Sequence, residues 1–193
     1  MELQFLKSQL NPHFLFNSLN TLYGTALREH SQDTAEGIQR LGDMMRFMLH
    51  DNNLDAIPMT REIEYLQNYI ALQKLRIQSS PDILIEDNIR PQSCNHQIAP
   101  MMLIPFVENA FKHGAGNNRN HTDIAISISM KDEELLFAVE NNFDSSVGSL
   151  NGSPGIGLQN VRRQLELLYP EHRMQVLNEN GRFKASIYLK PNN

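Results

Sequence analysis

The sequence predicts an α+β protein with an all-helical N-terminal part and an α/β sandwich as its C-terminal part. Before residue 80, apolar residues recur at helical spacing. After that point, several segments alternate apolar and polar residues, which is typical of half-buried strands. A chain of 193 residues is long enough for two domains, each with its own core. We therefore expect one domain over residues 1–80 and a second over residues 81–193.

The N-terminal part is expected to contain three helices. They cover residues 2–29, 33–51 and 59–78. The polar segments HSQD and DNNLDAIP separate them, and Thr60 with Glu64 makes a plausible start for the third. Pro12 lies inside the first predicted helix, where it removes a backbone N–H and its ring pushes against the carbonyl of Ser8. We expect a kink there that tilts the following residue, His13, outward.

The C-terminal part mixes strands and helices. The expected elements are a strand over 83–89, a helix over 98–114, a hairpin over 122–142, a helix over 155–170 and a hairpin over 174–190. Gly114 is a suitable C-cap for the first of these helices, and Pro170 stops the second. The first hairpin turns at Lys131–Glu134, and an Asn-Gly pair at 180–181 predicts the turn of the second.

Composition and charge exclude several classes of protein. The net charge is −5 and no basic stretch stands out, so we expect no direct contact with nucleic acid. The single cysteine, Cys94, excludes an internal disulfide and a Cys-x-x-Cys metal site. The longest apolar run, MMLIPFV, has seven residues and is too short for a membrane span, and no signal peptide is visible. We expect a soluble chain that suits a reducing compartment.

The first candidate functional residue is His13, in the segment LNPHFLFNSLN. An outward tilt suits a histidine that a second protein or domain must reach. The segment alone favours the simpler interpretation of a kinked helix with an ordinary core or surface histidine.

The second candidate is the helical segment FVENAFKHG, residues 106–114. On a helix, Glu108 and Lys112 share one face, and Asn109, Lys112 and His113 fall within about one turn. A carboxylate, an amide oxygen and cationic groups suit a metal-bound phosphate, because Mg²⁺ takes few protein oxygens and lysine offers a point charge. The alternative is a solvated polar face.

The third candidate is the glycine-containing segment GSPGIGLQN, residues 152–160, which opens a helix. Gly155 and Gly157 let backbone N–H groups approach phosphates at the positive end of a helix dipole. The spacing differs from a dinucleotide-binding motif because Asn160 stands where a third glycine is needed, and no P-loop lysine is present. An ordinary flexible loop remains the alternative.

Taken together and in this order, the three segments resemble the sensor histidine kinases of the LytS/YehU type. LKSQLNPHFLFNSLNTL is similar to the phosphoacceptor segment of that family, PMMLIPFVENAFKHG to its asparagine box and GIGLQNVRRQLELLYP to its second glycine box. LGDMMRFML and REIEYLQNYIALQKLRI also resemble the intervening helices. The resemblance covers nearly the whole chain.

The resemblance implies a helical dimerisation and histidine phosphotransfer domain over 1–80, and a Bergerat-type, GHKL ATP-binding domain over 81–193. His13 would take the γ-phosphoryl group of ATP and pass it to an aspartate of a response regulator, commonly of the LytTR type. Two helical hairpins would pair as a four-helix bundle, so a homodimer is expected. The chain would be the cytoplasmic portion of a protein anchored in the bacterial inner membrane through a sensor region absent here.

The same match implies roles for the remaining candidates. Asn109 would bind Mg²⁺, with Lys112 and His113 near the phosphates. Gly155 and Gly157 would hinge a short lid over the nucleotide, with Leu158 and Asn160 at its helix start.

Several positions depart from the family pattern. Phe14 follows the phosphoacceptor where many histidine kinases have an acidic base, so Glu108 becomes the candidate base. In VENNFD, Asn141 and Phe143 stand where the first glycine box has aspartate and glycine. The expected function is an ATP-dependent histidine kinase. The alternatives are a degenerate ATP-binding dimer that docks a regulator or partner kinase, and an ATP hydrolase of the same superfamily.

Overall fold

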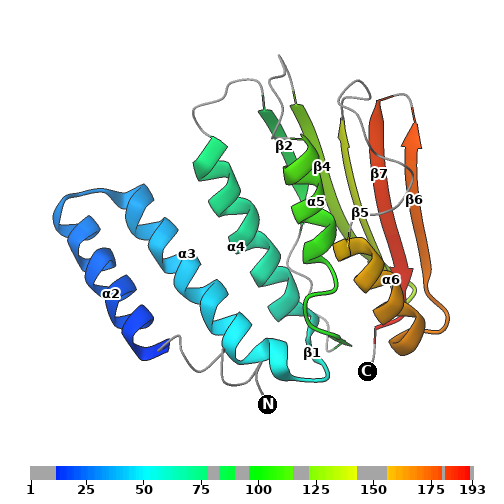
Figure 1. Cartoon of the computed structure of the whole chain (residues 1–193), viewed down its shortest axis with the longest axis horizontal. Coiled ribbons are helices and arrows are strands. Elements are labelled where there is room, and N and C mark those ends of the chain that lie inside the picture. The colour runs from blue at the N-terminus through cyan, green and yellow to red at the C-terminus, as the bar shows by residue number, and fades with distance from the viewer. Residues whose placement is uncertain are drawn as a thin grey trace.

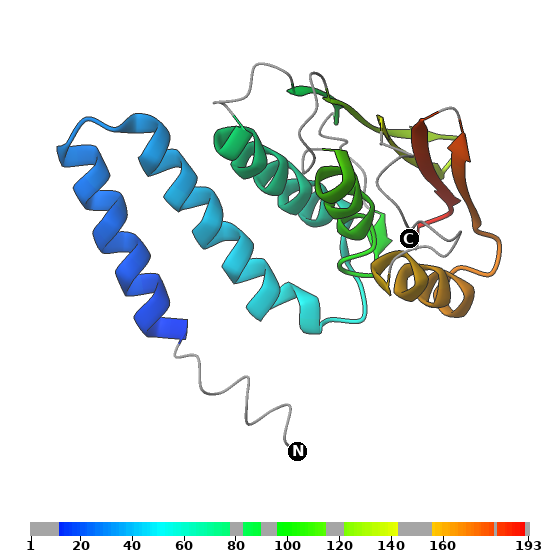
Figure 2. The same cartoon turned by 45° about the horizontal axis from the view of Figure 1, so that its top comes forward.

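A row of helices leads into a mixed β-sheet that helices cover on one face (Figure 1). The structure is a computed structural model, and it describes residues 12–77, 83–89, 96–114, 122–142, 156–179 and 181–191. Helices α2, α3, α4 and α5 follow one another side by side in chain order, as both views show (Figures 1 and 2). The predicted α+β class is confirmed.

The N-terminal helices lie close to their predicted positions. Their bounds are α2 Pro12–Arg28, α3 Gln32–Leu49, the 3₁₀ turn η1 Asp51–Asn53 and α4 Met59–Ile77. Helix α2 buries only Ala26, whereas α3 buries Met44 and Phe47 and α4 buries an apolar stripe that includes Ile63 and Leu66. Burial increases from α2 to α4 because, of these three helices, α4 lies closest to the sheet. The predicted kink at Pro12 involves residues before the described part of the chain.

The sheet contains five strands in the order β2-β4-β5-β7-β6. Their bounds are β2 Ile83–Asn88, β4 Thr122–Lys131, β5 Glu134–Asn142, β6 Arg173–Glu179 and β7 Arg182–Leu189. Strand β2 runs parallel to β4, and the other neighbours are antiparallel. The turn between β4 and β5 consists of Asp132 and Glu133, with φ of 51° and 64°. Two left-handed residues match the twist of the flanking strands in a two-residue hairpin.

Helices α5, Ile104–Gly114, and α6, Ile156–Leu168, pack on the sheet. Phe106 of α5 meets Phe137 of β5 edge to face, with ring centroids 5.8 Å apart. The buried cluster extends from Met44 through α4 to Leu189, so it contains side chains from both predicted domains. The predicted boundary between residues 80 and 81 lies outside the described residues, and the division stays a prediction.

The helix expected over 98–114 begins instead at Ile104. Residues Gln97–Ile98 form strand β3, which pairs with Ile57–Pro58 of β1 just before α4. Pro100 explains the difference, because a proline disfavours helical backbone in the residue before it. Pro105 is tolerated as the second residue of α5, where a helix has no partner for the backbone N–H.

Candidate functional site

His13 lies in the first turn of α2 and its side chain is exposed. The side-chain nitrogen of Asn17, one turn later, lies 3.3 Å from Nδ1 and 3.4 Å from Nε2 of the ring. The amide of Asn17 therefore lies against the imidazole ring from the same helix. The sequence analysis missed Asn17, although its i, i+4 spacing from His13 could have indicated the contact.

The polar residues of the second candidate lie on α5. Asn109 is half-buried and the side chains of Glu108 and Lys112 are exposed. His113 belongs to the same helix, but its side chain lies outside the described part of the structure. The three described side chains leave α5 on its accessible side, where a ligand can reach them.

Glu108 is exposed but close enough to α4 to interact electrostatically with Tyr65 and Tyr69. Burial raises its pKa. Burial, and to a lesser extent the nearby carboxylate of Glu108, raises the pKa of Tyr65 to about 12. The same two causes raise the pKa of Tyr69. Tyr69 also meets Phe111 of α5 edge to face, with centroids 5.9 Å apart. A carboxylate with a raised pKa is a better proton acceptor than an ordinary one, which suits a general base.

Asn141 is buried near the end of β5 on the face that packs against the helices. Buried residues alternate along β5, which places Asn141 on the same face as Phe137. Its side-chain nitrogen donates to the carbonyl of Asn142 at 3.0 Å. Its Oδ1 has no hydrogen-bond partner among the residues that the structure describes. A buried acceptor left unpaired costs about 1–3 kcal/mol, so this oxygen is a candidate ligand contact.

The residues of the glycine-containing segment lie at the start of α6. Gly157 is the second residue of that helix, and a Cβ there would lie 3.6 Å from the Cβ of Pro105 in α5. Leu158 is buried and Asn160 is exposed. Gly155 and Phe143 lie outside the described residues. The proposed hinge at Gly157 is therefore helical backbone here, next to the first turn of α5.

The structure brings one group of candidates together and leaves His13 apart. Asn109 and Lys112 on α5, Asn141 on β5 and Gly157 on α6 belong to elements that pack on one another at one face of the sheet. Helices α3 and α4 lie between α2 and α5 in both views (Figures 1 and 2). Within one chain, the histidine therefore does not adjoin the group that would hold a nucleotide.

The described residues contain neither a clustered metal site nor a membrane-spanning helix. Among them, no group of three or more His, Cys, Asp and Glu could hold a metal ion. A site that takes one amide oxygen from the protein, and its other ligands from phosphate and water, is compatible with this finding. No helix in the described ranges is both long and apolar enough to cross a membrane.

Comparison with known proteins assigns the family. Residues 1–80 match the family model described as Histidine kinase. The sensor histidine kinase BtsS of Escherichia coli strain K12 is 31% identical over 164 residues, which cover 85% of this chain and 28% of that protein. The sensor protein kinase HptS of Staphylococcus aureus strain USA300 is 30% identical over 166 residues, with the same shares.

The chain belongs to the histidine kinase family.

The predicted family is thus confirmed, and this histidine kinase chain spans 28% of the length of both relatives. A solved histidine kinase domain from the blue-light activated histidine kinase of Erythrobacter litoralis EL346 has a TM-score of 0.52 at 14% identity. The likeness covers 93% of this chain and 85% of that one, and it shows that the fold is shared. The roles of individual side chains stay predictions.

A second residue that the sequence did not indicate is Glu62. Glu62 of α4 is fully buried, and its carboxylate binds backbone N–H groups just before α5. Its position could have indicated burial, because it falls between Met59 and Leu66 on the apolar side of α4.

Proposed function

We propose that the chain is the phosphoacceptor and ATP-binding core of a two-component sensor histidine kinase, and that it phosphorylates His13 with ATP. The observation that carries the proposal is the exposed ring of His13 inside the segment that matches the histidine kinase model. A phosphoryl acceptor must reach a phosphate held by a different element. An exposed imidazole at the start of a helix meets that requirement.

Asn141 supports adenine as the base. Its NH₂ group is engaged by the carbonyl of Asn142, which leaves Oδ1 as the free acceptor. The exocyclic amine of adenine is a donor and fits that oxygen, whereas the keto oxygen of guanine would be repelled. The residues present therefore fit ATP.

Asn109 and Lys112 are the groups that we assign to the phosphates. The neutral amide oxygen of Asn109 would hold Mg²⁺, and the exposed ammonium of Lys112 would supply a point charge. When bound, Mg²⁺ neutralises charge on the phosphates. His113, Gly155, Gly157, Leu158 and Asn160 keep the nucleotide-binding roles that the family resemblance implies.

The transfer needs little covalent chemistry from the protein. An unprotonated ring nitrogen of His13 attacks the γ-phosphorus, and the bond from that phosphorus to the bridging oxygen breaks. The electron pair leaves with ADP. The phosphorylated ring is then a cation that loses its remaining N–H proton, and we propose Glu108 as the base that receives it. Since α3 and α4 separate α2 from α5, transfer requires either movement of the α2–α3 hairpin or His13 of a second copy.

The phosphoryl group would then pass to an aspartate of a response regulator, which we expect to be of the LytTR type. This assignment draws on the family, because both curated relatives are named as sensor kinases. We also propose that the chain works in the cytoplasm, next to a membrane-anchored sensor region of a longer protein.

Incubation with radiolabelled ATP and Mg²⁺ tests the proposed function. The wild type should acquire an acid-labile, base-stable label, and His13→Ala should acquire none. His50→Ala is the matched control, because His50 is also exposed and follows α3. Undiminished labelling of His13→Ala would refute the assignment of His13 as the acceptor.

A further inference from the structure

The first turns of α4 contain a carboxylate that is shielded completely from solvent. Glu62 is 0% exposed. A buried carboxylate is costly unless its oxygens are hydrogen-bonded, and both oxygens of Glu62 are used. Oε2 accepts from the backbone N–H of Met101 and Oε1 from that of Leu103, each at 3.0 Å.

These two amides belong to the segment that leads into α5. Met101 has a φ of 63°, a left-handed backbone conformation that residues other than glycine rarely adopt. Leu103 immediately precedes Ile104, the first residue of α5, where helix N–H groups have no partner within the helix. Glu62 therefore caps α5 from another helix and holds the strained residue in front of it.

Other contacts hold the same segment to its surroundings. The N–H of Met59, at the start of α4, donates to the carbonyl of His96 at 2.9 Å. The N–H of Ala99 donates to the hydroxyl of Tyr169, just after α6, at 2.8 Å. The segment before α5 is thus hydrogen-bonded both to the start of α4 and to Tyr169 at the end of α6.

We propose that Glu62 is a positioning residue for nucleotide binding. Its carboxylate fixes the first turn of α5 against α4 and thereby places Asn109 and Lys112, which lie further along the same helix. This inference rests on the proposed function, because it assigns those two side chains to the phosphates. Glu62 acts through α5 and does not touch the nucleotide.

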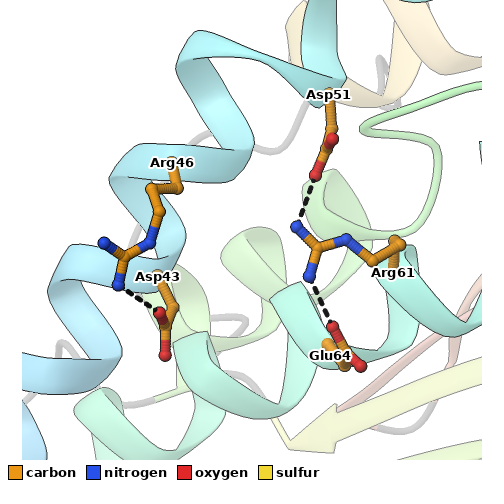
Figure 3. Close-up of polar contacts among 5 residues, drawn as sticks. All are labelled: Asp43, Arg46, Asp51, Arg61 and Glu64. Atoms are coloured by element: carbon orange, nitrogen blue, oxygen red, sulfur yellow. Dashed lines mark hydrogen bonds and ion pairs between the residues drawn. The ribbon is translucent and has the colours of Figure 1, made fainter.

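The neighbours of Glu62 on α4 provide a matched control. Arg61 is exposed and bridges Asp51 of η1 and Glu64, at 2.9 Å and 2.8 Å (Figure 3). Glu64 is exposed and belongs to the same helix. Glu64→Gln removes a carboxylate from α4 without reaching the start of α5.

Glu62 can change its protonation near neutral pH. Burial, against the opposing effect of the backbone hydrogen bonds, raises its pKa to about 7. The titratable groups that face it are Tyr65 on α4 and Tyr169 after α6, and its charge contributes to raising the pKa of each. Both tyrosines therefore stay neutral at and below about pH 8. A protonated Glu62 keeps one good acceptor oxygen for the N–H groups of Met101, Met102 and Leu103, and Gln also offers one.

The experiment compares wild type, Glu62→Gln and Glu64→Gln by two measurements. Calorimetry gives the affinity for Mg·ATP at about pH 6 and about pH 8. Hydrogen exchange of the nucleotide-free proteins gives the protection of the Met101 and Leu103 amides. We expect Glu62→Gln to bind ATP roughly tenfold more weakly than wild type at about pH 8 and similarly at about pH 6. Glu64→Gln should match wild type throughout.

Wild-type exchange alone provides a readout that needs no variant. After correction for intrinsic rates, protection of Met101 and Leu103 should fall as pH drops below about 7, because these N–H groups favour the carboxylate and protonation weakens their bonds while Glu62 stays buried. Global unfolding exposes Glu62 to water and therefore has the opposite pH dependence. Equal ATP affinity of wild type and Glu62→Gln at both pH values would overturn the inference. If wild type binds no ATP, the proposed function fails. In that case, equal protection of the Met101 and Leu103 amides in wild type and Glu62→Gln would still overturn the claim that Glu62 positions α5.

Discussion

At Asn141, we propose that the orientation of one amide group sets the preference for adenine over guanine. Oδ1 is buried without a described partner while the NH₂ group is engaged by Asn142. We predict that Asn141→Ala weakens ATP binding about tenfold, because the amine of adenine would lose its buried acceptor at a cost of about 1–3 kcal/mol. Calorimetry measures the change, and wild type should bind GTP more weakly than ATP.

Asn178→Ala serves as the control for this substitution, because Asn178 is exposed on β6. It should leave ATP affinity unchanged. Asn141→Asp retains an acceptor and should bind ATP more tightly than Asn141→Ala does. ATP affinity of Asn141→Ala equal to that of wild type would show that another group contacts adenine.

The sequence anticipates some of these side chains better than others. The burial of Asn141 follows from strict alternation along β5, a pattern that local sequence contains. The role of Glu62 depends on amides 39 and 41 residues away, so no local pattern predicts its hydrogen bonds. The contact of Asn17 with His13 is local, but helical spacing alone does not distinguish it from a solvated pair.

Among the elements, α5 combines a fixed start with an accessible polar side. Its first turn is capped by Glu62, and Asn109 follows one turn later. We predict that Asn109→Ala lowers the rate of autophosphorylation at least tenfold, which corresponds to about 1.4 kcal/mol or more of transition-state stabilisation. The physical reason is the loss of the amide oxygen proposed to hold Mg²⁺. Initial rates of radiolabelling at saturating ATP measure it.

Full activity of Asn109→Ala would count against the metal assignment. That result is expected if Asn109 is only a surface amide without a role in catalysis. Glu166→Ala on the exposed side of α6 provides a comparison that should leave the rate unchanged.

Helix boundaries show where sequence patterns lose their power. The helical periodicity of residues 98–114 continues past the true start of α5 because the preceding segment is equally apolar. The short pairing of β1 with β3 forms between segments about forty residues apart, which a local periodicity does not contain. By contrast, α3 and α4 begin and end within about two residues of prediction, since polar breakers flank both.

For the whole molecule, Glu62 couples stability to pH. Its pKa of about 7 in the folded state exceeds the ordinary value of 4.5, so between these values the unfolded chain has released a proton that the folded chain keeps. The stability that Glu62 contributes to the folded state is fully present below about pH 4.5. It is lost as pH rises through about 7, and the total loss is about 3 kcal/mol. We predict that Glu62→Gln lacks this part of the pH dependence.

Urea unfolding of both proteins at a series of pH values tests the coupling. The difference in unfolding free energy, wild type minus Glu62→Gln, should decline from about pH 5 to about pH 7.5. A constant difference would mean that Glu62 has the same pKa in the folded and unfolded chains.

We predict how the molecule assembles from the apolar side chains that α2 and α3 expose. This helix buries only Ala26, while Phe14 and Leu22 are 65% and 54% exposed and lie two turns apart on the same side. On α3, Leu41 and Met48 are each 42% exposed. Exposed apolar side chains of this number on one hairpin mark an association surface, and a symmetric dimer would place a second hairpin against the first.

We therefore predict that wild type has twice the chain mass of 22.1 kDa in light scattering at micromolar concentration. Leu22→Asp should shift it toward monomer, because a carboxylate buried between two helices pays a desolvation cost without a partner. Leu167→Asp is the matched control, since Leu167 is 74% exposed on α6, away from the hairpin. If wild type is a monomer, the prediction of a dimer is wrong. A shift in Leu167→Asp as large as that in Leu22→Asp would move the interface from the hairpin to α6.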